Sequence, residues 1–537
     1  MKKIKPIYLS ILSGLFLFAS WPVSPLTFII FFAFVPLLFA EAQIKNRSQF
    51  FWLTYLALFV WNIGTTWWVL NSTVIGGVLA IVLNPLLMCI PWMGFYNIKK
   101  RFGTTIGFIS LVIFWLTFEW IHLNWELSWP WLTLGNVFAT HPGWVQWYEY
   151  TGTSGGTLWV LLINISVFQL VQKGQNSKGE TRHQLLPIQH LIWLLADIIL
   201  PFFVSYLIIE SFKFPNSHTR LQSKNIVLVQ PNVDPWDEKF AAGKEESELR
   251  KLIQLSDSQI DSNTALVIWP ETAVPVPVNE DSMKTNYFIQ PVWYFLKNHP
   301  KINLLTGIEG FRVYDEQHKT PNSEKIPNTK KYFEEYNSAV LMDSHNFQAY
   351  HKSKLVPGAE TLPFFLKFMG SWFEEFGGTA GGYVKQGERT VFKTYNNTYN
   401  IAPAVCYESI YGEFMSKYIH HGANLIGIIT NDGWWRNTSG YKQHENYARL
   451  RAIESRCWIA RSANTGISCF INPDGEVINP QAYNSVASIK LDVPLSKAGE
   501  TFYVKNGDII SKLAMIFAIL LVFWDIIVII KSKRSRG

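Results

Sequence analysis

Ile401-Ala-Pro-Ala-Val-Cys-Tyr-Glu-Ser-Ile410 is a short apolar run that ends abruptly at Cys406 and continues with polar residues at helix-compatible spacing. The pattern predicts a β-strand, a tight turn that carries the thiol, and a helix. A thiol at such a turn faces substrate and lies near helical N–H groups, which lower its pKa and can bind an oxyanion. Because a lone cysteine in an apolar setting is more often an inert part of the core, this stretch needs support from the rest of the chain.

On both sides of this stretch, residues 225–495 consist of short β-branched runs, polar turns and a charged amphipathic helical pattern at 244–255. The predicted strands are 225–230, 265–269, 302–307, 338–342, 346–350, 401–405, 423–430 and 467–471, the last of which turns at Pro473-Asp-Gly475. Strands interleaved with helices predict an α/β sandwich that is long enough to bury a large core.

Three residues with complementary chemistry follow predicted strands. Glu271 follows Trp269-Pro270, Lys352 follows the strand around 346–350, and Cys406 ends a third strand. Sites in α/β sheets assemble at the carboxyl ends of strands. There a carboxylate can accept the thiol proton, the thiolate can attack a carbonyl, and the cation can stabilise the oxyanion. The alternative for Glu271 and Lys352 is a salt bridge on a solvated surface, which spacing alone does not exclude.

The rest of the chain is too apolar for an ordinary soluble protein, since the 537 residues are 48% hydrophobic, 15% aromatic and only 16% charged. Most of its apolar segments approach the ~20 residues that a helix needs to cross a bilayer. They are 7–21, 24–41, 50–69, 72–98, 104–123, 155–172, 185–209 and 509–530. The four cysteines have neither metal nor disulfide spacing, so we expect no cofactor and no metal.

Basic residues lie at both termini and in alternate connections between these segments. They are Lys2, Lys3, Lys5, Lys45, Arg47, Lys99, Lys100, Arg101, Lys173, Lys178, Arg182, Lys531, Lys533, Arg534 and Arg536. Short loops rich in Lys and Arg stay in the cytoplasm. We therefore expect about eight helices, cytoplasmic termini and residues 213–507 on the opposite side. The net charge of +7 is then a topology signal, and no nucleic-acid partner is expected.

Two other features of the apolar part bear on lipid contact. The connection at 124–154 is dense in Trp and Tyr, which fits either an interfacial aromatic belt or a loop lining a lipid entry site. Glu119, Asp197 and Asp525 are costly in hydrocarbon and predict inward-facing polar contacts.

The motifs Trp269-Pro-Glu271, Tyr350-His-Lys352 and Ala404-Val-Cys-Tyr-Glu408 resemble, in order, the three catalytic motifs of the nitrilase (carbon–nitrogen hydrolase) superfamily. Within it, the chain is similar to the bacterial apolipoprotein N-acyltransferases. Further matching stretches are Lys352-Ser-Lys-Leu-Val-Pro357 with Glu360, Thr430-Asn-Asp-Gly-Trp-Trp435, Gln443-His444 and Ala448-Arg-Leu-Arg-Ala452. The resemblance covers nearly the whole chain, most strongly residues 225–490. It implies an αββα sandwich attached to a transmembrane helical bundle.

The resemblance also implies roles for single residues. Glu271 is the expected general base and Cys406 the acyl-carrying nucleophile. Lys352 is the expected oxyanion stabiliser, together with the backbone N–H of Tyr407. This set forms a Glu–Lys–Cys triad on the family's motif positions.

Weaker matches surround the triad. Glu360 corresponds to a second essential glutamate that organises the site, Glu408 to the end of a Cys-Tyr-Glu motif, and Trp236 to a functional tryptophan. The chain departs from the family at Gly358-Ala359, where Phe-Gly is common, and at Lys354, where His is common. Neither departure falls on the triad.

Residues 362–382 combine an apolar run with a glycine-rich hinge. They fit either a core helix followed by a loop or a lid that dips into the membrane interface.

We expect a transmembrane bundle at 1–212, a nitrilase-like catalytic domain at 225–495 and a C-terminal transmembrane helix at 507–531. The resemblance implies acyl transfer from a membrane phospholipid, through a Cys406 thioester, to the α-amine of the S-diacylglyceryl cysteine of an apolipoprotein. It also implies the bacterial inner membrane, with the catalytic domain in the periplasm.

Two alternatives remain. A membrane-tethered amidase or nitrilase would hydrolyse a small amide with the same triad, but it needs no such helical platform. A transporter or receptor would use the α/β part for binding only, and binding does not require a nucleophile.

Overall fold

The computed structural model describes residues 4–176, 188–213, 222–236, 239, 243–362, 382–495 and 500–534. Contacts divide the chain into two compact units. The helical unit comprises Met1–Trp67, Gly77–Phe214 and Asn506–Gly537, and the α/β unit comprises Trp68–Gly76 and Pro215–Lys505. Residues Trp68–Gly76 therefore pack with the α/β unit although apolar helices flank them in the sequence. Most of the segment expected to form either a core helix or a lid, residues 363–381, lies outside the described residues.

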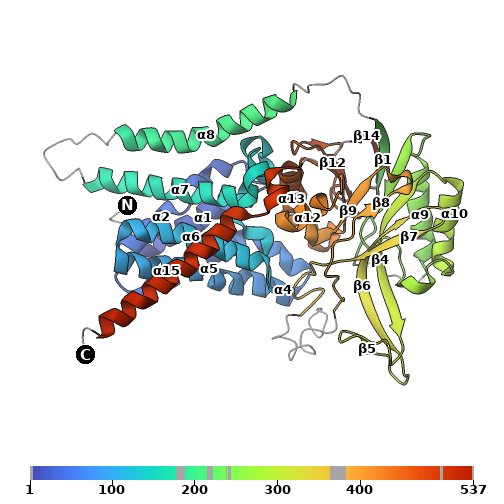
Figure 1. Ribbon diagram of the computed structural model, residues 1–537, viewed down its shortest axis with the longest axis horizontal. Helices are drawn as coiled ribbons and strands as arrows, with labels where there is room; N and C mark the ends of the chain where they lie inside the picture. Colours follow the sequence, from blue (N-terminus) through green and yellow to red (C-terminus); the bar gives the residue numbers. More distant parts are fainter. Residues whose placement is uncertain are drawn as a thin grey trace. The chain divides into compact units, whose positions relative to one another are not determined.

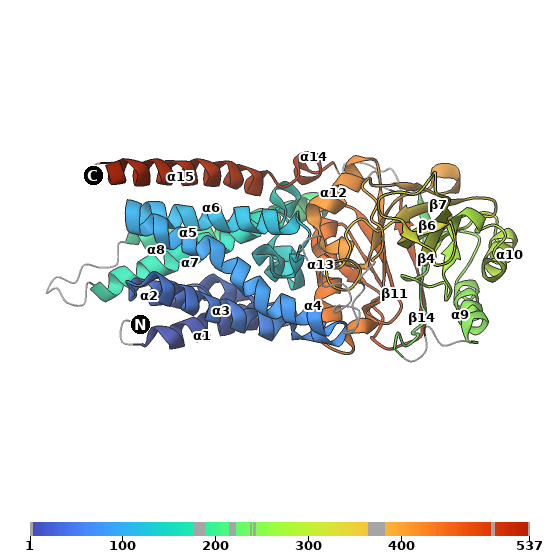
Figure 2. The same cartoon turned by 90° about the horizontal axis from the view of Figure 1, so that it is seen from below.

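The helical unit is built from apolar helices. Their bounds are α1 (Pro6–Ser20), α2 (Val35–Ala42), α3 (Arg47–Thr66), α4 (Val74–Val78, shared with the α/β unit), α5 (Asn84–Phe102), α6 (Thr104–Leu123), α7 (Tyr148–Asn176), α8 (Ile188–Lys213) and α15 (Ile509–Arg534). Gly103, with a φ of +89°, ends α5 through its N–H to Lys99 O (3.0 Å) and lets α6 begin at the next residue. Figure 2 shows α5, α6 and α15 running side by side.

Six stretches of the described chain are long and apolar enough to cross a membrane. They are Arg47–Asn71, Val74–Phe102, Thr104–Leu123, Tyr148–Gly174, Leu191–Ser211 and Ile509–Arg534. Two shorter apolar stretches, Pro6–Ser20 and Thr27–Ala42, precede them. Together they coincide with the eight apolar segments expected from the sequence, so the helical fold class is confirmed. Only the first two are too short to count as spans by themselves.

Of the three acidic residues expected to make inward-facing polar contacts, Glu119 and Asp525 have polar partners, whereas Asp197 is exposed on α8, so the expectation is wrong for Asp197. Glu119 accepts hydrogen bonds from Trp115 Nε1 (2.9 Å), Leu134 N (2.8 Å) and Thr157 Oγ1 (2.7 Å). Asp525 of α15 pairs with Arg101. The aromatic connection at 124–154 folds into short 3-10 turns and buries Trp131 and Phe138, so much of it forms part of the core of this unit.

The α/β unit contains two sheets. The first has the strand order β14-β1-β2-β4-β6-β5, with β3 paired to β4 and β7 to β6. Its strands are β1 (Ser223–Gln230), β2 (Thr264–Ile268), β3 (Val278–Asn279), β4 (Asn303–Tyr314), β5 (Glu324–Lys325), β6 (Tyr332–Met342), β7 (Phe347–His351) and β14 (Ala487–Pro494). Strands β1, β2 and β4 run parallel, while β6 is antiparallel to both β4 and β7. The carboxyl ends of β2 and β7 therefore meet at one edge.

The second sheet has the order β13-β12-β11-β10-β9-β8. Its strands are β8 (Phe392–Lys393), β9 (Asn400–Val405), β10 (Leu425–Thr430), β11 (Trp458–Ala463), β12 (Cys469–Ile471) and β13 (Val477–Ile478). Strands β9, β10 and β11 are parallel, so their carboxyl ends also share an edge. All three are buried along nearly their whole length, and β9 and β10 are apolar runs, as expected for strands with both faces buried.

The two sheets face each other, and helices cover their outer faces (Figure 1). Helices α9 (Glu245–Asp257) and α10 (Gln290–Asn298) pack on the first sheet, and α12 (Gly412–His420) and α13 (Ser439–Ser455) on the second. Gly427 of β10 makes this close approach possible, since a Cβ there would lie 2.7 Å from Leu305 Cδ2 of the facing sheet. The expected αββα sandwich is confirmed.

Candidate active site

Cys406 lies at a sharp turn at the carboxyl end of β9. Its φ of +52° falls in the left-handed region, which costs a non-glycine residue about 1–3 kcal/mol. A short 3-10 turn, Cys406–Ile410, follows and leads to α12. The backbone accepts this strain because the strand and the turn are buried on all sides, and the Cys406 side chain itself is only 7% exposed.

The expectation that helical N–H groups lower the Cys406 pKa is wrong. Burial raises the pKa of the thiol well above its ordinary value, and the negative charge of Glu271 raises it further, while the Lys352 ammonium opposes both. The turn after Cys406 is too short to provide the dipole of a full helix. Cys406 therefore rests as a neutral thiol, and a base would have to remove its proton before it could act as a nucleophile.

Glu271 follows β2 in a turn that packs against β4. The turn is fixed by hydrogen bonds from Gly307 N to Pro270 O (3.1 Å) and from Ala273 N to Gly307 O (2.8 Å). A Cβ at position 307 would lie 2.7 Å from Glu271 Cα, so only glycine lets the two segments approach this closely. The carboxylate accepts hydrogen bonds from Asn337 Nδ2 (2.8 Å) and Asn431 N (3.1 Å), which fix its orientation.

Lys352 directly follows β7, and its ammonium is almost completely buried. It donates to Glu360 Oε1 at 2.8 Å and to Glu271 Oε1 at 3.3 Å. Burial alone would lower the lysine pKa, but the carboxylates of Glu360 and Glu271 outweigh it and raise that pKa well above its ordinary range. Lys352 thus stays protonated and acts as a hydrogen-bond donor and fixed positive charge.

Asn337, in the middle of β6, bridges the two carboxylates. Its Nδ2 donates to Glu271 Oε1 (2.8 Å) and to Glu360 Oε1 (2.9 Å), and its backbone carbonyl accepts from Lys352 N (2.9 Å). The second oxygen of Glu360 accepts from Val356 N (2.8 Å). Sequence analysis missed Asn337, and the available signal was an amide directly before the apolar run Ser338–Met342.

Glu408 joins the cysteine turn to the lysine segment. One carboxylate oxygen accepts from Val405 N (2.9 Å), just before Cys406. The other accepts from Tyr350 Oη (2.7 Å), Ser353 N (2.7 Å) and Lys354 N (3.0 Å), on both sides of Lys352. Burial raises the Glu408 pKa, although these donors oppose the shift. The side chain is fully buried, so it acts as an internal clamp.

A buried ion network holds the Cys406 backbone from the other side. His444 of α13 contacts the Cys406 carbonyl (3.1 Å) and Ser409 Oγ (3.0 Å) through Nε2. Its Nδ1 faces Asp432 Oδ1 (2.9 Å), and Arg461 pairs with the other Asp432 oxygen (2.7 Å). Burial would raise the Asp432 pKa, but Arg461 and His444 outweigh it and hold that pKa at about 2.

Aromatic rings extend this support to the segment Trp68–Gly76. Trp435 packs edge-on against His444, with ring centroids 5.4 Å apart, and Trp68 packs edge-on against Trp435 at 4.8 Å. Trp68 also lies directly on the start of α13, where a Cβ at Gly440 would come within 2.6 Å of its ring. Asn71 Nδ2 donates to Trp435 O at 3.3 Å.

The remaining candidates make contacts with aromatic rings. Tyr407 is buried with its ring edge-on to Tyr411 (5.3 Å). Lys354 points its ammonium over the same Tyr411 ring (4.9 Å), which leaves Lys352 as the lysine of the cluster. Trp236 is 46% exposed and packs edge-on against Trp434 (5.1 Å), next to the turn after β10.

Sequence analysis also missed Lys239. Its buried ammonium donates to the Glu271 carbonyl (3.3 Å) and to the Thr272 hydroxyl. Burial lowers the pKa of the Lys239 ammonium to about 8, although the negative charge of Glu271 acts to raise it. Lys239 thereby fixes the turn of the general-base candidate, in which Thr272 has a φ of +44°.

The arrangement supplies a thiol, a carboxylate and a fixed cation within electrostatic reach of one another, as nucleophilic acyl transfer requires. Within the described ranges, no group of three or more His, Cys, Asp or Glu side chains is placed to hold a metal ion.

Comparisons with known proteins match both units. The family model described as "Carbon-nitrogen hydrolase" matches residues 228–501, just over half of the chain, and "Apolipoprotein N-acyltransferase N-terminal domain" matches residues 13–166. An apolipoprotein N-acyltransferase of Chlorobaculum tepidum is 29% identical over 530 residues, which cover 95% of both chains. One from Aquifex aeolicus is 31% identical over 366 residues, 66% of this chain and 69% of its own.

Among solved structures, an amidase from Nesterenkonia is similar at 15% identity with a TM-score of 0.35, covering 53% of this chain and 94% of the amidase. The two family matches and the full-length relatives carry the assignment. The chain belongs to the apolipoprotein N-acyltransferase family, whose α/β part is a carbon–nitrogen hydrolase domain.

Proposed function

We propose that this protein N-acylates apolipoproteins, taking the acyl chain from a membrane phospholipid and carrying it as a thioester on Cys406. The family assignment supports the overall reaction. The buried cluster of Glu271, Lys352 and Glu360 beside Cys406 is the single observation that carries the mechanism.

In the first half-reaction, Glu271 takes the proton from the Cys406 thiol, and the thiolate attacks the ester carbonyl of the phospholipid. Lys352 and the backbone N–H of Tyr407 stabilise the oxyanion of the tetrahedral intermediate. The intermediate collapses with cleavage of the ester C–O bond. The leaving lysophospholipid alkoxide takes the proton from Glu271, which leaves an acyl thioester on Cys406.

In the second half-reaction, the neutral α-amine of the diacylglyceryl cysteine attacks the thioester. Glu271 accepts the amine proton, the C–S bond breaks, and the thiolate regains a proton from Glu271. The products are an N-acyl amide and the free thiol. Because the side chains of the cluster are buried, water has little access, which favours aminolysis over hydrolysis of the thioester.

The surrounding residues hold the reacting groups in place. Glu360 and Asn337 fix the Lys352 ammonium and the Glu271 carboxylate. Glu408 keeps the lysine segment at the cysteine turn. The exposed ring of Trp236 offers a contact for substrate beside Trp434.

The protein is a multi-pass membrane protein of bacterial type. The alternation of basic connections supports cytoplasmic termini and a periplasmic catalytic domain in the inner membrane. In this proposal residues 1–212 and 507–531 form the membrane part, and residues 225–495 carry the chemistry.

The rival function is an amidase that hydrolyses a small amide. It would use the same thiol, base and cation, so the active-site chemistry does not separate the two. The apolar helical unit and the matched N-terminal family domain favour the lipid substrate.

Intact-protein mass spectrometry of the detergent-purified enzyme with phospholipid tests the proposal. We expect a hydroxylamine-sensitive acyl adduct on the wild type, none on Cys406→Ser, and none on Lys352→Met, which keeps the thiol. Added diacylglyceryl peptide should discharge the adduct and gain the acyl mass. Hydrolysis of a soluble amide without any lipid adduct would instead establish the amidase.

A further inference from the structure

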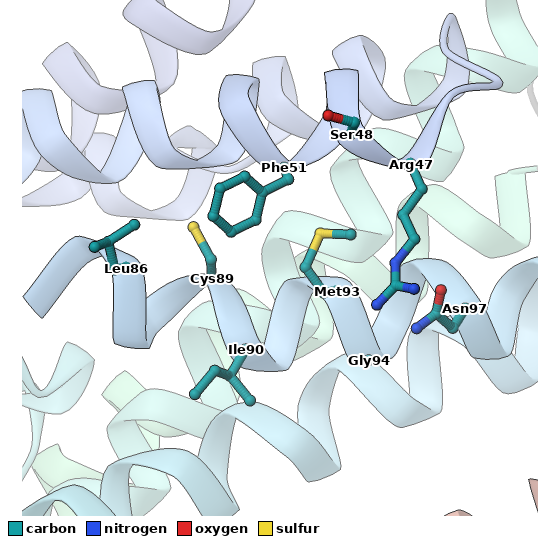
Figure 3. Close-up of a pocket in the computed structure, with 9 residues that line it drawn as sticks. All are labelled: Arg47, Ser48, Phe51, Leu86, Cys89, Ile90, Met93, Gly94 and Asn97. Atoms are coloured by element: carbon teal, nitrogen blue, oxygen red, sulfur yellow. The ribbon is translucent and has the colours of Figure 1, made fainter. Parts of the chain in front are cut away.

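A groove runs between α3 and α5 on the surface of the helical unit (Figure 3). Its cavity volume is about 670 Å³, within the range of small-ligand sites. It is lined by Arg47, Ser48, Phe51, Leu86, Cys89, Ile90, Met93, Gly94 and Asn97. The proposed catalytic mechanism uses none of these residues.

The groove is polar at one end only. Arg47 and Ser48 begin α3, and Asn97 lies near the end of α5. Figure 3 shows the Arg47 side chain extending toward α5, with Asn97 beside it. The rest of the lining is mainly apolar, from Phe51 and Met93 to Ile90 and Leu86.

Arg47 differs from Lys99 and Arg101 at this end of the helices. Lys99 pairs with Glu41, and Arg101 pairs with Asp525. Within the described part of the chain, no carboxylate pairs with Arg47, and the residue is exposed. An exposed guanidinium at the head of an apolar groove is complementary to an anion that carries a long apolar chain.

We propose that this groove binds a glycerophospholipid, with the phosphate diester on Arg47, Ser48 and Asn97 and one acyl chain along Phe51, Met93, Ile90 and Leu86. This occupant matches both the charge and the apolar length of the groove. The inference rests on the membrane embedding proposed above, which places the Arg47 end at the cytoplasmic leaflet.

This lipid is not the acyl donor. Helix α3 has 20 residues, so its two ends lie about 30 Å apart. The groove's polar end is at the start of α3, whereas the other end of α3 leads into Trp68–Gly76, which belong to the α/β unit and contact Trp435. The lipid therefore serves the α3–α5 pair as a bound structural ligand.

A second groove offers an internal comparison. It lies between α5, α6 and α15, has a volume of about 760 Å³ and is lined almost entirely by apolar residues such as Phe114, Met515 and Phe523. It has no cationic residue in its lining. A lipid in this second groove would be bound through its acyl chain alone, so its binding would not depend on a phosphate group.

The test is photocrosslinking in nanodiscs of phosphatidylethanolamine and phosphatidylglycerol, with the Cys406→Ser protein as background. Because that protein cannot form a thioester, the result is independent of the proposed catalysis. The probes are a phosphatidylethanolamine and a diacylglycerol that carry the same diazirine acyl chain. Labelled peptides are mapped by mass spectrometry.

We expect the phospholipid probe to label the α3 and α5 groove peptides and the diacylglycerol to label them far less. Arg47→Gln should reduce this labelling about tenfold, since a charge-assisted hydrogen bond is lost. Met93→Trp, which fills the apolar part, should reduce it similarly while leaving Arg47 in place. Lys100→Gln is the matched control, because Lys100 is exposed at the same end of α5 but does not line the groove.

Equal labelling by the two probes, or labelling unaffected by Arg47→Gln, would overturn the proposal. The same holds if the label appears only on the α5–α6–α15 groove. Size-exclusion profiles of each variant show whether it has folded, and Met93→Trp provides a second test should Arg47→Gln aggregate.

Discussion

Glu271 affects Cys406 in two opposite ways. In the proposed mechanism it removes the thiol proton as a base, but as a negative charge in a buried site it raises the thiol pKa. Lys352 has the reverse electrostatic effect and lowers that pKa. These effects can be separated, because alkylation at high pH depends on the thiol pKa while acylation by phospholipid also depends on the base.

Glu271→Gln should therefore lower the acylation rate by about 10²–10⁴-fold and speed alkylation of Cys406 by iodoacetamide at pH 9. In the wild type, alkylation should be slow at pH 7 and rise with pH. Peptide mass spectrometry of the Cys406 peptide measures both. Lys352→Met is the matched variant and should slow alkylation. A Glu271→Gln protein with both rates reduced would contradict the electrostatic role.

Asn337 holds two carboxylates at fixed distances from one ammonium. Asn337→Ala should lower kcat about tenfold and leave KM nearly unchanged, since one hydrogen bond to each carboxylate is lost but no contact with lipid is expected. Steady-state acyl transfer to a diacylglyceryl peptide measures the split. Asn346→Ala, in the exposed turn before β7, is the control. A raised KM with unchanged kcat would argue that Asn337 contacts substrate instead.

Glu408 accepts four hydrogen bonds through two buried oxygens. Glu408→Gln keeps the shape of the side chain but replaces one acceptor oxygen by an NH₂ group. That group then faces N–H or O–H donors, with which it cannot form a hydrogen bond. We expect it to lower the free energy of unfolding by about 1–3 kcal/mol and to abolish most activity, because it separates the cysteine turn from the lysine segment. Thermal unfolding in detergent measures the stability. A variant with unchanged midpoint and activity would show that the clamp is unnecessary.

At the level of strands and helices, burial determines which elements can be recognised from sequence. Strands β2, β9 and β10 are continuous apolar runs and were predicted within one or two residues. Strand β11 was missed because Arg461 and Ser462 interrupt it, and Arg461 is buried only through its ion pair with Asp432. Strand β14 was missed because it lies at the edge of its sheet and is only partly buried.

The same reasoning applies to the site. The motifs predicted Glu271, Lys352 and Cys406 as candidates, because each directly follows a recognisable strand or turn. The links between them depend on contacts across the two sheets, such as Glu408 with Tyr350 or Glu271 with Asn431. The raised pKa of the Cys406 thiol also results from burial, which cannot be read from the sequence.

Gly307 of β4 sets the distance between its strand and the Glu271 turn. Gly307→Ala should displace that turn, since the new Cβ would lie 2.4 Å from Thr272 N, which is backbone and has little freedom to move. We expect a loss of about 1–3 kcal/mol in stability and a large loss of activity. Gly387→Ala is the control, because a Cβ there meets nothing within 4 Å. Equal effects of the two changes would refute this explanation.

At the scale of the whole molecule, the chain passes between its two units four times, at residues 67–68, 76–77, 214–215 and 505–506. The α/β unit is therefore not one continuous stretch of sequence. Its first piece, Trp68–Gly76, reaches the catalytic centre through the rings of Trp68, Trp435 and His444.

Trp68→Ala should consequently destabilise the α/β unit by about 3–5 kcal/mol, as expected for a large buried ring, and lower the acylation rate of Cys406. Thermal unfolding and the intact-mass adduct assay measure the two effects. Trp193→Ala is the control, because that ring on α8 is 70% exposed. Loss of stability from Trp193→Ala alone would contradict the packing role of Trp68.

The discontinuous α/β unit has a consequence for biosynthesis. Asn71 and its partner Trp435 are 364 residues apart, so Asn71 leaves the ribosome about 20–70 s before Trp435 at ordinary translation rates. During most of that interval neither the Trp435 ring, on which Trp68 packs, nor Cys406 has been synthesised. The proposed active site can form only after translation has passed Trp435 and α13, which ends at Ser455, so each newly made molecule stays inactive until most of its chain is complete.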